Sequence, residues 1–248
     1  MQSSHLFAPL PLPNGSTIPN RIAKAAMEEN MADCDHRPSE ALINLYRAWA
    51  EGGAGLIITG NVMIDARAMT GPAGVVLEDD RHLDRFKAWA DAARSGGGHA
   101  WMQINHPGRQ MPAGLGQPTL APSALPHLPQ EPAPRALDAD GLVRIREAFA
   151  AAARRAARIG IDCIELHGAH GYLLHQFLSP LSNRRDDAYG GSLENRMRFP
   201  LEVFDAVRAA FPAGRPVGMR ISATDWVDGG WDLAQSVALA QALKARGC

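Results

Sequence analysis

The sequence predicts an α/β protein of the (β/α)8 barrel type, a TIM barrel, with about five β/α units present. Three observations predict this class: short apolar runs bounded by glycine alternate with helical patterns, polar residues gather directly after several of these runs, and no GxGxxG motif follows the first one. Strict alternation requires a parallel sheet with helical crossovers. Chemistry at the carboxyl ends of many strands favours a closed barrel over an open, dinucleotide-binding sheet.

The five expected strands are short and buried, as parallel strands covered by helices usually are. They lie at residues 21–27, 53–64, 99–105, 161–166 and 216–222, with the sequences RIAKAAM, GAGLIITGNVMI, HAWMQIN, IDCIEL and PVGMRIS. A helix is expected after each strand, at residues 39–53, 81–98, 138–160, 194–211 and 232–247. Ser39 can cap the first helix, and Gly160 can close the third. Two Pro/Gly-rich or irregular stretches, 107–137 and 172–195, interrupt the repeat.

Length and composition exclude several classes of protein. The chain has 248 residues, 46% of them hydrophobic, and 25 basic residues nearly balance 26 acidic ones, for a formal charge of -1. Nucleic acid and anionic membranes are therefore not expected partners. No leader-like or membrane-spanning stretch is visible, which predicts a cytoplasmic protein. The three cysteines are widely spaced and are expected to be reduced thiols.

Polar side chains are expected at one end of the predicted barrel because they follow its strands. They are Glu28, which follows Met27, then Asn61, Gln103 with Asn105 and His106, His167, and Arg220 with Ser222. Residues of this kind at the carboxyl ends of barrel strands usually form the active site. We therefore expect one mouth that binds a small-molecule substrate.

The fourth strand is followed by the densest group of such residues. His167 and His170 are three positions apart across a Gly-Ala turn, and could donate two N–H hydrogen bonds to one carbonyl or phenolic oxygen of a ligand. Tyr172, whose phenol has a reference pKa of about 10, could supply a proton as a general acid. A metal-dependent hydrolase using His167, His170 and His175 is a weaker alternative, because HxxH in a loop is little evidence for a metal and the chemistry requires none.

Longer motifs make the chain similar to a known family. The stretch from residue 167 to residue 199 reads HGAHGYLLHQFLSPLSNRRDDAYGGSLENRMRF, and the other landmarks, in order, are PNRIAKAAM, LIITGN, MQINHPGRQ, APSA and GMRISATDW. Together they resemble the Old Yellow Enzyme family of FMN-dependent NAD(P)H oxidoreductases. The resemblance covers nearly the whole chain and implies a single FMN-binding barrel domain over residues 1–248.

The resemblance implies a role for each matching residue. The backbone at Ala26 and Met27 would touch the flavin ring, Gln103 would bind its pyrimidine edge, and Arg220 would place positive charge near N1 and the C2 carbonyl. Asn61 and His167 would also line the cofactor. His167 and His170 would hold the substrate oxygen, and Tyr172 would be the proton donor. Hydride would pass from NAD(P)H to flavin N5 and then to the β-carbon of an activated alkene.

Each of these roles has a structural alternative. Gln103 could cap a loop, Arg220 could pair with Asp225, and the Asn61 amide could serve its own turn. Glu28 stands where many relatives have a Thr or Cys beside the flavin C4 carbonyl; it would disfavour the reduced anion if it were ionised there, or it could turn away.

The resemblance also concerns both ends of the chain. Residues 6–18 fit the hairpin lid that closes the barrel bottom in the family, with Asn14-Gly15 as its turn. Strands six to eight, which supply the FMN phosphate site, are expected to be missing from this chain. Unpaired edge strands then predict association as a homo-oligomer or with a complementing chain. An alternative function is therefore a catalytically silent, truncated barrel that binds no flavin alone.

Overall fold

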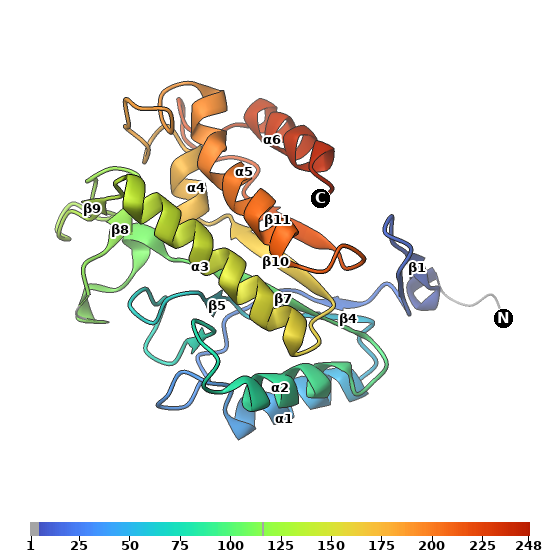
Figure 1. Cartoon of the computed structure of the whole chain (residues 1–248). Coiled ribbons are helices and arrows are strands. Elements are labelled where there is room, and N and C mark those ends of the chain that lie inside the picture. The colour runs from blue at the N-terminus through green and yellow to red at the C-terminus, as the bar shows by residue number, and fades with distance from the viewer. Residues whose placement is uncertain (1–4, 116) are drawn as a thin grey trace.

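A computed structural model describes residues 5–115 and 117–248 of the chain, and its centre is a parallel sheet (Figure 1). Five strands are hydrogen-bonded in the order β11-β10-β7-β4-β3. Their bounds are β3 (Ala23–Lys24), β4 (Leu56–Ile58), β7 (His99–Asn105), β10 (Cys163–Gly168) and β11 (Val217–Ile221). Every pairing along this path is parallel. The strands follow chain order across the sheet, as in a (β/α)8 barrel, and the predicted fold class is confirmed.

A long helix follows each of these five strands along the chain. The helices are α1 (Glu40–Glu51), α2 (Leu83–Arg94), α3 (Ala139–Arg158), α5 (Leu193–Ala210) and α6 (Leu233–Ala245). Figure 1 shows α1 beside α2, and α3 beside α5. The two helices of each pair are in contact. Among the described residues, no helix has the length and apolarity that a bilayer crossing requires.

Capping residues set the helix boundaries as the sequence predicts. The Ser39 side chain accepts a hydrogen bond from the Leu42 N–H at the start of α1. Gly160 follows α3 with a φ of 88°, a left-handed value that glycine adopts readily. Local chemistry therefore fixes where these helices begin and end.

The central strand β7 separates the core from the site. Ala100, Met102 and Ile104 belong to the buried apolar cluster that contacts the helices. Because alternate residues of a strand point to opposite faces, Gln103 and Asn105 project from the other face. One face of the sheet thus packs against the helices, and the other carries polar side chains that can bind a ligand.

Residues 53–64, predicted as one strand, are two. After β4 the chain breaks at Thr59–Asn61 and resumes as β5 (Val62–Met63), which pairs with both β7 and β6 (Val75–Val76). A Cβ at Gly60 would lie 2.5 Å from the Met27 carbonyl oxygen. The strand is therefore interrupted where the backbone at Met27 comes close to Gly60. The apolar content of residues 53–64 does not reveal this contact.

The two irregular stretches contain short elements that the sequence does not predict. Between 107 and 137 lie the 3-10 turns η2 (Gly108–Gln110) and η3 (Ala113–Leu115), and the parallel pair β8 (Leu120–Ala121) and β9 (Arg135–Ala136). Between 172 and 195 lies the helix α4 (Leu173–Leu178). At two to six residues each, they are too short to produce a clear periodicity.

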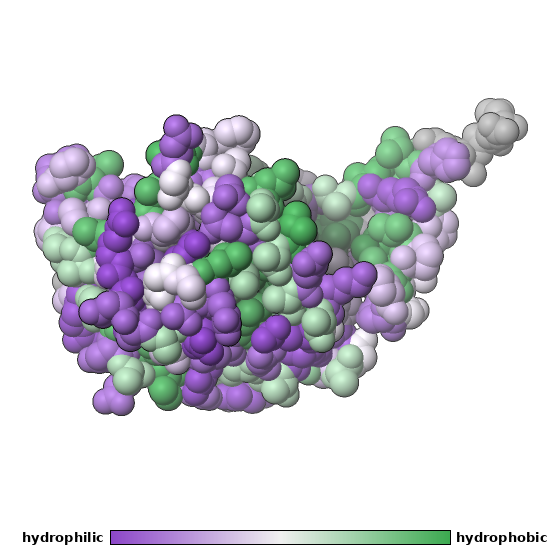
Figure 2. Space-filling model, turned by 90° about the horizontal axis from the view of Figure 1, so that it is seen from above, coloured by the Kyte–Doolittle hydropathy of each residue, from purple (hydrophilic) through white to green (hydrophobic). Residues whose placement is uncertain are grey.

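The N-terminal hairpin is present where the family resemblance placed it. After the turn η1 (His5–Phe7), β1 (Leu10–Pro11) pairs antiparallel with β2 (Thr17–Ile18), and Gly15 in the connecting turn has a φ of 87°. Asn14 donates a hydrogen bond from Nδ2 to the Gly214 carbonyl, 3.1 Å away, just before β11. The hairpin therefore lies at the amino-terminal end of the strands, and its segment stands out from the molecule in Figure 2.

Candidate active site at the strand ends

Register across the sheet brings the expected site residues side by side. His167 of β10 is the direct partner of Arg220 on β11, and Glu165 is the partner of Gln103 on β7. His167 and Gln103 are buried, with exposed fractions of 3% and 2%. Residues separated by more than 50 positions along the chain thus lie side by side at the carboxyl ends of the strands.

His167, His170 and Tyr172 form a compact aromatic group after β10. The His167 ring centroid is 5.1 Å from that of His170 and 4.9 Å from that of Tyr172, with both contacts close to edge-on. The backbone turns sharply between them, because His170 and Gly171 have φ values of 58° and 74°. The Ser222 hydroxyl accepts a hydrogen bond from the His170 N–H at 3.0 Å, which anchors this turn to the loop after β11. The structure therefore brings together the three residues predicted as catalytic.

Both imidazoles are neutral near pH 7. Burial, followed by the nearby His170 and the Arg220 charge, lowers the pKa of His167 to about 3. Burial and Arg220 also lower the pKa of His170. The Nδ1 atom of His167 accepts a hydrogen bond from the Ala169 N–H at 3.3 Å, so its proton is assigned to Nε2. His167 is therefore prepared to donate an N–H to a ligand oxygen.

The Tyr172 hydroxyl is protonated under the same conditions. Burial and the charge of Glu28 raise its pKa above the ordinary value. In the described part of the chain this hydroxyl has no hydrogen-bond partner, whereas the Tyr172 backbone N–H donates to the Ala169 carbonyl at 3.1 Å. Its backbone is fixed and its phenolic proton is available.

Glu165 is a site residue whose role the sequence does not predict. Its Oε1 accepts a hydrogen bond from Gln103 Nε2 at 2.7 Å, and burial raises the pKa of the carboxyl. The contact fixes the orientation of the Gln103 amide, whose backbone N–H also donates to the Thr59 hydroxyl at 3.1 Å. The spacing of Glu165 and His167, two positions apart on one strand, was the available signal that both face the same side.

Arg220 connects β11 to the segment that follows β3. Its guanidinium donates a hydrogen bond to the Ala26 carbonyl at 3.3 Å. The alternative pairing of Arg220 with Asp225 is wrong, since Asp225 Oδ1 instead lies 2.9 Å from Nε2 of His175. Next to Ala26, the Met27 side chain is 62% exposed.

A buried network holds the segment that carries Ala26 and Met27. Lys24 Nζ lies 2.8 Å from Glu29 Oε1, and the Tyr46 hydroxyl donates to the same oxygen at 2.7 Å. The Gly60 N–H donates to that hydroxyl at 2.9 Å. The end of the first strand is thus tied to α1 and to the break after β4.

Two buried asparagines next to the site have unsatisfied polar atoms. Asn61 Oδ1 and both side-chain polar atoms of Asn105 lack partners among the described residues. Buried polar groups without partners are uncommon in proteins and often mark a ligand site. Donors and acceptors of this kind, with the Gln103 amide and the Arg220 charge, are the chemistry that the heteroatom edge of a flavin ring requires.

Glu28 and His175 have other partners in this structure. Glu28 Oε1 accepts a hydrogen bond from the Thr70 hydroxyl at 2.7 Å. Nδ1 of His175 accepts one from the Gly171 N–H at 2.8 Å, and its Nε2 contacts Asp225. His175 therefore supports the turn that carries His170. Within the described ranges, no group of three or more His, Cys, Asp and Glu side chains is placed to hold a metal ion.

Comparison with known proteins decides the family. Residues 5–247 match the model of the NADH:flavin oxidoreductase / NADH oxidase family. The chain belongs to this family. Membership in the NADH:flavin oxidoreductase family confirms the predicted resemblance, and with it flavin and nicotinamide chemistry as the chemistry of the family.

Known proteins resemble the chain in both sequence and structure. An NADH oxidase of Thermoanaerobacter brockii is 41% identical over 233 residues, covering 93% of this chain and 36% of that protein. The NADH-dependent flavin oxidoreductase iliE of Hypocrea jecorina is 37% identical over 249 residues, covering 92% and 62%. A structure of morphinone reductase with tetrahydroNAD superposes with a TM-score of 0.84 at 34% identity, covering 99% and 72%. The chain thus spans between about one third and two thirds of these two curated relatives.

Proposed function

We propose that the chain forms the flavin- and substrate-facing part of an FMN-dependent NAD(P)H oxidoreductase that reduces an alkene conjugated to a carbonyl group. The observation that carries this proposal is the grouping of His167, His170 and Tyr172 beside Arg220 and Gln103. Bound FMN would supply the hydride, taken from NAD(P)H. The family membership supports this choice of cofactor.

Each protein group has a defined part in this proposal. Neutral His167 and His170 donate N–H hydrogen bonds to the substrate carbonyl oxygen and so favour negative charge on it. Tyr172 donates its phenolic proton to the α-carbon, and hydride is added at the β-carbon. Arg220 would place positive charge against the flavin ring, and Gln103, fixed by Glu165, would orient the ring through its amide.

The first test is the visible spectrum of the purified chain after FMN is added and the excess removed. Retention of one FMN per chain with a shifted spectrum supports the proposal. A colourless protein would favour the catalytically silent barrel instead. Two observations support that alternative. β3 and β11 are the edge strands of the described sheet, and Trp226, in the loop after β11, is 90% exposed.

The second test separates the oxygen-binding role from flavin binding. In the holoprotein, a phenol should produce a long-wavelength charge-transfer band, and a His167→Ala, His170→Ala double variant should lose it while retaining flavin. A double variant that titrates with phenol as the unchanged protein does would contradict the role of the two imidazoles.

A further inference from the structure

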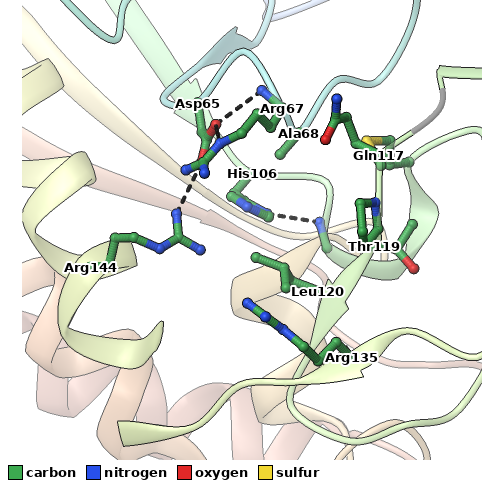
Figure 3. A pocket seen from close by; sticks show the side chains of 12 residues that line it. Asp65, Arg67, Ala68, His106, Gln117, Thr119, Leu120, Arg135 and Arg144 are labelled. Atoms are coloured by element: carbon green, nitrogen blue, oxygen red, sulfur yellow. Dashed lines mark hydrogen bonds and ion pairs between the residues drawn. The ribbon is translucent and has the colours of Figure 1, made fainter. Parts of the chain in front are cut away.

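A cavity lined by three arginines lies beside the loop that follows β7. It has a volume of about 210 Å³ and lies between the loop after β5, the start of α3 and the loop 107–137. Figure 3 shows Arg67, Arg135 and Arg144 around the ring of His106. The residues proposed for catalysis and flavin binding do not contribute to its lining.

The charges in this cavity are unbalanced. Asp65, which is 6% exposed, is the one carboxylate among the described lining residues. It lies 2.9 Å from the Arg67 guanidinium and 3.0 Å from that of Arg144. The Arg135 guanidinium makes no ion pair or hydrogen bond with the described residues. Three positive charges thus face one negative charge, and an excess of positive charge is left in the cavity.

His106 adds an unused hydrogen-bond donor to the cavity wall. The side chain is 1% exposed, and burial lowers its pKa to about 4, so the ring is neutral near pH 7. The Gly108 N–H donates to Nδ1 at 3.0 Å, which assigns the proton of the neutral ring to Nε2. Nε2 has no partner in the described part of the chain. A buried N–H without an acceptor has a free-energy cost that an anionic ligand would remove.

The apolar part of the lining indicates the rest of the ligand. Ala68, Met111 and Leu120 lie in the wall beside the charged groups. Met111, Thr119 and Arg135 also line an adjoining cavity of about 520 Å³, whose wall includes residues 132–134, Pro-Ala-Pro. An anionic head group could therefore contact the arginines while an apolar body extends past Arg135.

We propose that this cavity is a binding site for a small organic anion, with its carboxylate or phosphate head held by Arg67, Arg135 and Arg144. Guanidinium groups suit both head groups because their N–H donors match paired oxygens. Arg135 lies at the junction of the two cavities and is free of competing partners. It is the residue through which the site is best tested.

The test is calorimetric titration of the purified chain, without flavin, with benzoate and with phenyl phosphate at constant ionic strength. We expect saturable binding of at least one probe with a stoichiometry of one, and a dissociation constant weakened about tenfold or more by Arg135→Gln. Arg154→Gln removes the same charge from the exposed face of α3 and should leave the affinity unchanged. The probe that binds identifies the head group.

Two results would overturn the proposal. One is the absence of saturable binding of both probes, and the other is equal loss of affinity in Arg135→Gln and Arg154→Gln, which would indicate nonspecific attraction. The Arg135 side chain is exposed and unpaired, so the variant should keep the circular dichroism spectrum and unfolding curve of the unchanged chain. Since no step requires flavin, the result is independent of the proposed oxidoreductase function.

Discussion

Nε2 of His175 lies 2.9 Å from Oδ1 of Asp225, so the helix that follows Tyr172 is joined to the loop that follows β11. Asp225 Oδ2 also accepts a hydrogen bond from the Ser179 hydroxyl at 2.6 Å and one from the Trp231 N–H at 2.8 Å. Burial by itself would raise the pKa of the Asp225 carboxyl, but these hydrogen bonds bring it down to about 2. One carboxylate thus fixes the relative position of two segments that border the site.

The Asp225 contacts predict a stability that depends on pH. Because the folded pKa is below the unfolded value of about 3.9, the carboxylate stabilises the fold above that pH, and the effect is lost as the pH falls toward 2. Asp225→Asn should lower the free energy of unfolding by about 1–2 kcal/mol at pH 7 and by less at pH 3. Urea unfolding at both pH values measures this difference. Asp228→Asn, at an exposed position of the same loop, is the control; equal effects of the two changes would refute the prediction.

His167 predicts a change in stability in a higher pH range. Its folded pKa of about 3 is below the unfolded value of about 6.5, so the unfolded chain binds more protons between these values. Stability should therefore fall as the pH is lowered from about 6.5 toward 3. His167→Gln should flatten this decline in urea unfolding measured at pH 7, 6, 5 and 4. His5→Gln, at an exposed residue, should leave the decline intact.

Tyr172→Phe should separate the two half-reactions of the proposed enzyme. Reduction of bound flavin by NAD(P)H should continue, while reduction of the alkene should slow by about 10²–10⁴-fold because the proton donor is absent. Stopped-flow absorbance measures the two steps separately. Tyr189→Phe, which removes a hydroxyl next to Glu202 away from the site, should change neither step. An unchanged oxidative rate in Tyr172→Phe would mean that another group supplies the proton.

Asn105→Leu should stabilise the chain in the absence of ligand. Both polar atoms of this fully buried side chain are unpartnered, and such groups cost about 1–3 kcal/mol each. We expect a gain of about 1 kcal/mol in the free energy of unfolding, measured by urea denaturation. Asn44→Leu on the exposed face of α1 should give no comparable gain. A destabilised Asn105→Leu variant would show that the asparagine is better satisfied than its contacts indicate.

The fold and the centre of the site were predictable because their signals are periodic or dense. Alternating apolar runs and helical faces located the five parallel strands and the helices between them, and His167, His170 and Tyr172 lie within six positions. The break at Gly60 was not predictable in this way. It accompanies a close approach of the Met27 backbone, and Met27 is remote from Gly60 in the sequence. The arginine cavity was missed for the same reason: Arg67, Arg135 and Arg144 come from three segments, and nothing in their local sequence indicates that they converge.

Glu165 illustrates a different limit. It stands in the same strand as His167 and was visible from the sequence, but a carboxylate on a buried strand has no single interpretation. Only the register that places it opposite Gln103 shows what it binds. Pairing across a sheet is tertiary information, and it decides the role of a residue whose type and position are already known.

The hydrogen bond from Asn14 to Gly214 joins residues 200 positions apart, and the bond from Arg220 to Ala26 spans 194. During synthesis the hairpin and the first strand leave the ribosome long before Gly214 and Arg220 have been added to the chain. Contacts of such sequence separation form slowly, because the entropy of closing a long loop is lost before the contact stabilises the chain. We therefore expect the contact between Arg220 and the segment after β3 to form late in folding, after the central strands have paired, so that the proposed site is completed among the last parts of the molecule.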